Sequence, residues 1–133
     1  MSAERVTYLD SSALVKLAAD EPESAALRQF LRRRRRLAAS ALAQTEVARA
    51  LMDDGPLAVR RGREVLRTVN LIRINDDVLT LAGELQPAEL RSLDAIHLAT
   101  AQLLGQDFGR VITYDERVAG AARFLRMRVL SPT

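Results

Sequence analysis

The hydrophobic pattern divides the chain into short strand-like runs and longer segments with helical spacing. Apolar and β-branched residues gather in five brief runs, which predict strands at residues 6–9, 37–40, 71–75, 110–114 and 128–130. Between these runs the apolar spacing predicts helices at residues 11–18, 22–31, 41–52, 57–69, 76–85, 93–104 and 116–125. Short strands that alternate with helices are typical of an α/β fold, with a parallel sheet covered by helices on both faces.

Serine residues precede several of the predicted helices and are expected to cap them. A serine hydroxyl at this position accepts a hydrogen bond from a backbone N–H that the first helical turn leaves unpaired. We expect this role for Ser11 or Ser12, for Ser40 and for Ser92. Asp10 then lies at the carboxyl end of the first strand. No repeat or linker divides the sequence, so residues 1–133 are expected to form one domain.

The composition narrows the chemistry that this chain can perform. Aromatic residues make up only 4% of the 133 residues, which leaves little material for a sheet that stacks RNA bases on aromatic rings. Cysteine is absent and His97 is the only histidine. Cys/His zinc sites, disulfides, cysteine nucleophiles and mechanisms with two imidazoles are therefore excluded. Catalytic chemistry would have to come from carboxylates.

Arginine supplies nearly all of the positive charge. Lys16 is the one lysine among 20 basic residues, and the net charge of +3 permits binding to nucleic acid without requiring it. Two groups of arginines are candidate phosphate contacts: the run at residues 32–36, and Arg60, Arg63 and Arg67, which share one face of a predicted helix. The alternative for both groups is a solvated helix end or face.

The sequence shows no signal for secretion or membrane insertion. Its start lacks the charged and apolar regions of a signal peptide, and no apolar run approaches the ~18 residues of a membrane span. We therefore expect a cytoplasmic protein that does not enter a membrane.

Four acidic residues lie among apolar neighbours in segments that otherwise resemble protein core: Asp10, Glu46, Asp94 and Asp115. A buried carboxylate is costly unless a cation or hydrogen-bond donors compensate its charge. Asp10 and Asp115 both end predicted strands, so they are expected at the sheet edge where parallel α/β folds bind ligands. One shared metal ion would compensate all four acids.

Each acid also has a simpler explanation. Glu46 could pair with Arg49 on a helix surface. Asp94 could stabilise the N-terminus of its helix, and Asp10 and Asp115 could be ordinary turn residues. Because the four acids share the same unusual setting, the metal site is favoured over four separate explanations.

The type of ligand atom predicts the metal and the reaction. Oxygen-only ligand sets suit Mg²⁺ or Mn²⁺, and Mg²⁺ commonly shares phosphate oxygens with its substrate. Such ions activate water and neutralise a leaving oxygen, so phosphodiester cleavage needs no protein nucleophile. The hydroxyls of Ser11, Ser12 and Thr113 are candidate auxiliary groups that could orient a carboxylate or a water. His97 is either a partner of Asp94 or, more simply, a satisfied histidine on a packed helix.

Four motifs carry the acidic residues: LDSSALVKL at residues 9–17, TEVARA at 45–50, LDAIHLATA at 93–101 and ITYD at 112–115. In this order and at these spacings they resemble PIN-domain ribonucleases, in particular the bacterial VapC-type toxins. The resemblance extends over nearly the whole chain, which makes it far more specific than any single motif.

The resemblance implies a three-layer, Rossmann-like fold with an acidic pocket that holds Mg²⁺ or Mn²⁺. It implies that Asp10 and Asp94 are the principal metal ligands, Glu46 the helix-borne acid and Asp115 the fourth acid. It also implies cleavage of structured RNA of the tRNA or rRNA class, with arrest of translation. The expected partners are a second copy of the chain, in a homodimer, and a VapB-type antitoxin that neutralises the toxin.

Two other classes remain open at this point. A non-catalytic PIN-like interaction domain needs only the fold. A phosphoacceptor receiver domain is also a small α/β unit with acids at strand ends, but it needs an early acidic pair and a lysine near its late strands. In this chain Asp10 is single and Lys16 lies early. Metal-dependent RNA cleavage would separate the enzyme from both alternatives.

Overall fold

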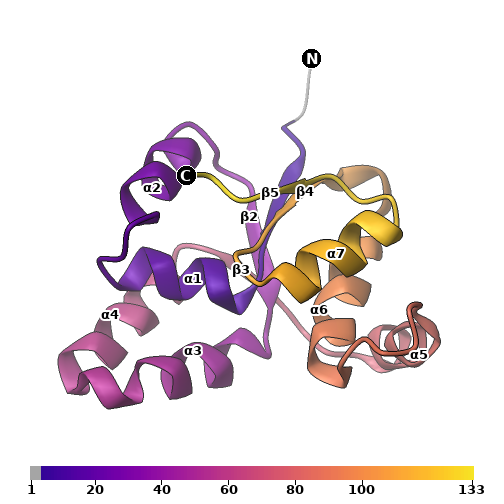
Figure 1. Cartoon of the computed structure of the whole chain (residues 1–133), viewed down its shortest axis with the longest axis horizontal. Coiled ribbons are helices and arrows are strands. Elements are labelled where there is room, and N and C mark those ends of the chain that lie inside the picture. The colour runs from indigo at the N-terminus through magenta and orange to yellow at the C-terminus, as the bar shows by residue number, and fades with distance from the viewer. Residues whose placement is uncertain (1–3) are drawn as a thin grey trace.

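The computed structural model describes residues 4–133, and a five-stranded parallel sheet lies at its centre (Figure 1). The strands are β1 Val6–Leu9, β2 Leu37–Ser40, β3 Asn70–Ile72, β4 Phe108–Ile112 and β5 Val129–Leu130. They are arranged in the order β3-β2-β1-β4-β5, so that β1 is the middle strand. The predicted α/β class and the sheet of five short parallel strands are confirmed.

Helices cover both faces of this sheet. They are α1 Ser11–Ala18, α2 Ser24–Leu31, α3 Ala43–Leu51, α4 Pro56–Leu66, α5 Asp76–Glu84, α6 Ser92–Gln102 and α7 Glu116–Phe124, with short 3₁₀ turns at Met52–Asp54 and Gly105–Asp107. Neighbouring side chains of a strand point to opposite faces. In β1, Leu9 therefore packs into a core with α1 to α4, whereas Tyr8 packs against α6 and α7. Helix α5 packs on α6. The result is the predicted three-layer arrangement.

The starts of α1 and α6 differ from the sequence-based expectation. Helix α1 is capped by Asp10 rather than by Ser11 or Ser12, because the Asp10 carboxylate accepts a hydrogen bond from the backbone N–H of Ala13 at 3.1 Å. Ser92 is the first residue of α6 rather than its cap. The expected serine caps at these positions are therefore wrong, and the acid takes the capping role in α1.

The fourth strand also ends earlier than predicted. It stops at Ile112, because the residues after it form the turn from which Asp115 caps α7. Ser40 was also expected to cap a helix, but it ends β2, and the N-cap of α3 is Leu42. The Ser40 hydroxyl accepts the N–H of Leu42 at 3.1 Å in the turn that leads into α3. The two acids Asp10 and Asp115 thus both follow strands directly or within a short turn.

The strand order places a topological switch between β1 and β4. From β1 the chain first builds β2 and β3 on one side, and then crosses to build β4 and β5 on the other. Open α/β sheets bind ligands at the carboxyl edge beside such a switch. Helices α1 and α7 begin at this edge, after β1 and β4 (Figure 1). Within residues 4–133 no helix has the length and apolarity needed to cross a membrane.

Candidate active site

Asp10 is the most buried of the predicted acids, with 4% of its surface exposed. Its carboxylate accepts hydrogen bonds from the Ser12 hydroxyl at 2.6 Å, from the Ala13 N–H at 3.1 Å and from the Thr113 hydroxyl. Thr113 follows β4, so groups after both strands at the switch hold the same carboxylate. Ser12 and Thr113, two of the three candidate auxiliary residues, both contact Asp10.

Burial has a direct effect on the charge of Asp10. It raises the pKa of the Asp10 carboxyl above its ordinary value, and the hydrogen bonds from Ser12, Thr113 and Ala13 offset this only in part. An ionised Asp10 is therefore costly in the folded chain. A cation bound to this carboxylate would reduce that cost.

Asp94 and Asp115 share one arginine. Asp94 lies in the first turn of α6, and Arg91 Nε donates to its Oδ2 at 2.7 Å. Arg91 Nη2 donates to Asp115 Oδ2 at 3.2 Å. The other oxygen of Asp115 accepts the N–H of Arg117 at 2.8 Å and caps α7. The turn-residue explanation thus accounts for one oxygen of Asp115, while the second oxygen faces Arg91.

Glu46 lies on α3 and pairs with His97 of α6 rather than with Arg49. His97 Nε2 lies 2.6 Å from Glu46 Oε1, and the Ser11 hydroxyl donates to the same oxygen at 2.5 Å. Partial burial opposes ionisation of Glu46, but the hydrogen bonds from His97 and Ser11 outweigh it and lower the pKa of Glu46. The surface ion pair considered from the sequence is not formed, and Glu46 is held as a carboxylate.

Hydrogen bonds through Arg91 and Thr113 connect Asp94, Asp115 and Asp10 in series. Glu46 has separate partners, and the acids do not form a single cluster. Within residues 4–133, no three acidic, histidine or cysteine side chains are close enough to hold a metal ion together. The chemistry of the donors nevertheless fits a hard cation, since carboxylate and hydroxyl oxygens meet at Asp10. Coordination by several acids would require Arg91 to release Asp94 and Asp115.

Three residues at this edge have roles that the sequence reasoning did not assign. Arg91 bridges two acids, and its position three residues before Asp94 is a signal that could have indicated an i,i+3 ion pair. His97 was considered as a partner of Asp94 or as a satisfied core residue, but it contacts Glu46. Tyr8 contacts His97 from β1, and a buried tyrosine hydroxyl generally requires such a partner. The last two contacts depend on tertiary packing that local spacing does not encode.

The candidate RNA-binding arginines lie in two different places. Arg60 and Arg63 belong to α4 and Arg67 is its C-cap. Arg63 and Arg67 also border an apolar groove between α3 and α4. The run at residues 32–36 precedes β2, so it lies at the amino edge of the sheet, opposite to the acids. Glu4 accepts two backbone N–H groups of this run, which gives part of it a structural role.

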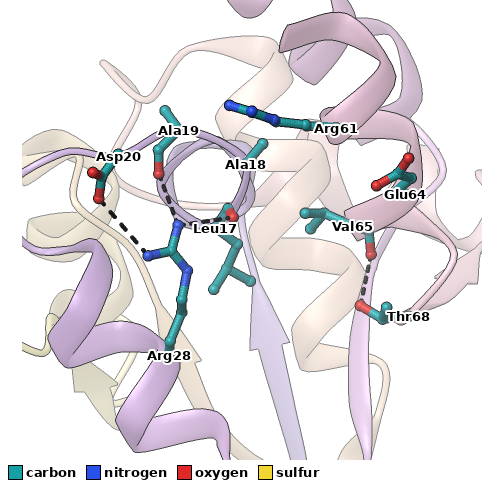
Figure 2. Close-up of a pocket in the computed structure, with 9 residues that line it drawn as sticks. All are labelled: Leu17, Ala18, Ala19, Asp20, Arg28, Arg61, Glu64, Val65 and Thr68. Carbon is teal, nitrogen blue, oxygen red and sulfur yellow. Dashed lines mark hydrogen bonds and ion pairs between the residues drawn. The ribbon is translucent and has the colours of Figure 1, made fainter. Parts of the chain in front are cut away.

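A surface hollow of about 480 Å³ lies at the C-terminal end of α1, between α2 and α4 (Figure 2). Arg28 extends into it, donating to the carbonyls of Leu17 at 3.4 Å and Ala19 at 3.0 Å, with Asp20 at 3.9 Å. A basic side chain that satisfies the last carbonyls of a helix stabilises its end. This hollow is therefore explained by the packing of α1, and it contains none of the four acids.

Three other surface hollows contain the acids, with the exception of the buried Asp10. One hollow is lined by Asp94 and Arg91, a second by Asp115 and Thr113, and a third by Glu46 together with the two serines after Asp10. The first and second share Glu116, and the second and third share Tyr114. Neighbouring hollows therefore share one lining residue each, and Asp10 contacts Ser12 and Thr113, which line two of them.

Comparison with known proteins identifies the family. The model of the PIN domain matches residues 7–124. Ribonuclease VapC46 of Mycobacterium tuberculosis is 57% identical over 126 residues, which cover 95% of this chain and 97% of that protein. Ribonuclease VapC47 of the same species is 35% identical, with 94% and 96% covered.

Solved structures support the same conclusion. A toxin-antitoxin complex from Klebsiella pneumoniae contains a chain with a TM-score of 0.73 and 26% identity, covering 96% of this chain and 98% of that one. M. tuberculosis VapC20, described as a Sarcin-Ricin loop cleaving toxin, has the same fold with a TM-score of 0.73 and 15% identity, covering 86% and 94%. These matches leave no place for the receiver-domain alternative. With a PIN-domain match over most of its length and more than half of its residues shared with a VapC ribonuclease, this chain belongs to the VapC ribonucleases of the PIN-domain family.

Proposed function

We propose that this chain is a metal-dependent endoribonuclease and the toxin of a toxin–antitoxin pair, with residues 1–133 acting as one domain. The observation that supports this most strongly is the placement of four acids near the carboxyl edge of the sheet. Asp94, Asp115 and Glu46 line three surface hollows, and the buried Asp10 is held by Ser12 and Thr113, which line two of them. The relationship to VapC ribonucleases supports a role for these acids in RNA cleavage.

Mg²⁺ or Mn²⁺ is the proposed cofactor, and these four acids are the residues proposed to hold it. When bound, such an ion supplies an activated water and neutralises charge on the leaving oxygen of a phosphodiester. The chain itself supplies orientation. Ser12 and Thr113 fix the rotation of Asp10, and Ser11 and His97 fix that of Glu46. This arrangement needs no protein nucleophile.

The proposed substrate is structured RNA of the tRNA or rRNA class, and its cleavage would inhibit translation. Folded RNA is recognised largely through shape, phosphates and unstacked loop bases. The chain has few aromatic residues for stacking and many arginines, a composition that suits recognition by shape and phosphate contacts.

The proposed partners are a second copy of the chain and a VapB-type antitoxin. The relationship to a chain from a Klebsiella pneumoniae toxin-antitoxin complex supports an antitoxin partner. A segment of the antitoxin could place its apolar side chains in the apolar groove between α3 and α4, which is lined by Val47, Val59 and Leu66. A cationic antitoxin residue could then pair with the nearby acids, as Arg91 pairs with Asp94.

The proposed function can be tested by sequencing the 5′ ends of RNA fragments after expression of the wild-type chain and of Asp10→Asn. The wild type is expected to produce new ends at one or a few positions in a structured RNA, and the variant to produce none. Growth should stop only with the wild type, and co-expression of the antitoxin should restore it. Identical fragment ends in both cultures would support the non-catalytic alternative.

Replacing Arg60 and Arg63 by Gln is expected to weaken RNA binding without moving the cleavage site. Phosphate contacts position an RNA but do not select its sequence, and each lost contact should reduce the salt dependence of binding, by roughly 0.7 in log–log slope where the RNA is single-stranded. The matched control replaces two arginines of the run at residues 32–36, which lies at the amino edge of the sheet, opposite to the acids. Binding constants measured over a series of salt concentrations check this. Unchanged affinity and slope in the α4 variant would mean that this face is only solvated.

A further inference from the structure

A continuous chain of hydrogen bonds runs from the sheet to Glu46 through the only histidine of the protein. The backbone N–H of Ser40 donates to Tyr8 Oη at 3.1 Å. Tyr8 Oη lies 2.8 Å from His97 Nδ1, and His97 Nε2 lies 2.6 Å from Glu46 Oε1. Tyr8 is 0% exposed and His97 2%, so bulk water does not compete for these contacts.

The groups at the two ends of this chain determine where its protons lie. A backbone N–H can only donate, so Ser40 occupies a lone pair of the Tyr8 oxygen and leaves the Tyr8 proton to find its own acceptor. A carboxylate can only accept, so the contact with Glu46 requires a proton on His97 Nε2. His97 Nδ1 lies 2.8 Å from Tyr8 Oη and can accept the Tyr8 proton, and in that arrangement Nδ1 itself carries no proton.

The ionisation of Tyr8 is consistent with this assignment. Burial raises the pKa of the Tyr8 phenol well above its ordinary value, so the phenol keeps the proton that it donates. In this arrangement the proton of His97 is on Nε2, the atom that lies 2.6 Å from Glu46 Oε1.

We infer that Tyr8 and His97 are positioning residues, which orient the Glu46 carboxylate through a fixed histidine tautomer. The inference rests on the proposed function in one respect, namely that Glu46 belongs to the active site. His97 and Ser11 both donate to Glu46 Oε1. The chain of hydrogen bonds therefore holds one oxygen and presents the other, Oε2, to a metal ion or a water.

The physical reason for such a device is the flexibility of glutamate. A partly exposed Glu46 on α3 would otherwise sample several rotamers, and an active-site carboxylate must be held in one orientation to act efficiently. Tyr8 comes from the central strand and His97 from the fully buried side of α6, so the restraint is anchored in the rigid core. Asp10 is held differently, by hydroxyls of the loops that follow β1 and β4.

The first test is a ¹⁵N NMR spectrum of the imidazole in the untagged chain. His97 is the only histidine, so one set of ring signals is expected. The inference predicts a protonated Nε2 and an unprotonated Nδ1 at neutral pH. Tyr8→Phe removes the donor to Nδ1 and should produce a mixture of tautomers. A proton on Nδ1 in the wild type, whether as the other tautomer or as an imidazolium, would overturn the inference.

The second test compares two substitutions of the histidine. His97→Leu removes the N–H donor, whereas the amide of His97→Gln can still donate to Glu46. Loss of an outer hydrogen-bond partner commonly costs 10–100-fold in metal affinity or activity. We expect a loss of this size in Mn²⁺ affinity and in kcat for His97→Leu, with KM little changed, and recovery of most of it in His97→Gln. If His97→Leu does not fold, Tyr8→Phe is compared with the wild type instead. It removes the hydrogen bond to His97 Nδ1 and should also lower Mn²⁺ affinity and kcat.

A double-mutant cycle decides whether His97 acts through Glu46. In a Glu46→Gln background, His97→Leu should change Mn²⁺ affinity by less than about 2-fold, because the group that it positions has already been altered. Equal effects in both backgrounds would overturn the inference. A wild-type chain that binds Mn²⁺ and shows the expected tautomer but cleaves no RNA would contradict the proposed function alone.

Discussion

Asp10→Asn is expected to reduce RNA cleavage by more than about 100-fold while the chain remains folded. Loss of an outer partner alone commonly costs 10–100-fold, and Asp10 is proposed to bind the metal directly. Asparagine keeps the size of the side chain and one carbonyl oxygen, so the N–H of Ala13 can still be capped. Steady-state cleavage of a defined RNA measures the loss.

The stability of the same variant, unlike its activity, should not fall. The folded-state pKa of Asp10 is raised, so the folded chain holds the Asp10 proton more tightly than the unfolded chain. Metal-free protein therefore loses stability as the pH rises from the unfolded pKa, about 4, through the folded pKa. Asp10→Asn removes this loss. Its free energy of unfolding at neutral pH, without metal, should equal or exceed that of the wild type.

The control for this variant is Asp107→Asn, an equivalent change at an exposed residue before β4. It should alter neither cleavage nor the pH dependence of unfolding. A clearly destabilised Asp10→Asn in EDTA would mean that the carboxylate serves the fold and would count against the electrostatic argument.

Asp94→Asn and Asp115→Asn are expected to differ in effect, although Arg91 contacts both acids. Asp94 is 9% exposed and does not cap α6, so no structural role competes with metal binding. Its replacement should therefore reduce cleavage by more than about 100-fold. One oxygen of Asp115 is engaged in capping α7, so a loss of about 10-fold is expected there. Asparagine caps helices as well as aspartate does, and Asp115→Asn should therefore melt close to the wild type.

Cleavage rates at saturating metal, together with melting temperatures, check this difference. Equal losses at the two positions would show that Asp115 contributes as much as Asp94 to the reaction. Because asparagine retains the capping oxygen, a large fall in the melting temperature of Asp115→Asn would show that the charge of Asp115 serves the stability of the fold.

The fold was largely predictable from the pattern of the chain. Period-two and helical spacing are local properties, and they correctly indicated the α/β class and five short strands. Boundaries were less accurate where side chains compete for backbone groups. Asp10 displaces Ser11 and Ser12 as the cap of α1, and this choice depends on contacts with Thr113 across the sheet.

The candidate site was predictable in its acids but not in their partners. A carboxylate among apolar residues is visible in the sequence, which is why Asp10 and Asp94 could be selected. Contacts between distant elements are not visible: His97 reaches Glu46 only because α6 and α3 meet beside the sheet. The bridge from Arg91 to Asp115, over 24 residues, arises in the same way.

The most direct test of the metal-dependent mechanism is RNA cleavage by the purified chain in EDTA, followed by addition of Mg²⁺ or Mn²⁺, with Asp10→Asn treated in parallel. The acids of the carboxyl edge are proposed to act through a bound ion, so the wild type should be inactive in EDTA and regain cleavage at its specific site when metal is added. The variant should remain inactive under both conditions. Cleavage at the same site and rate in EDTA, or by Asp10→Asn, would contradict this account.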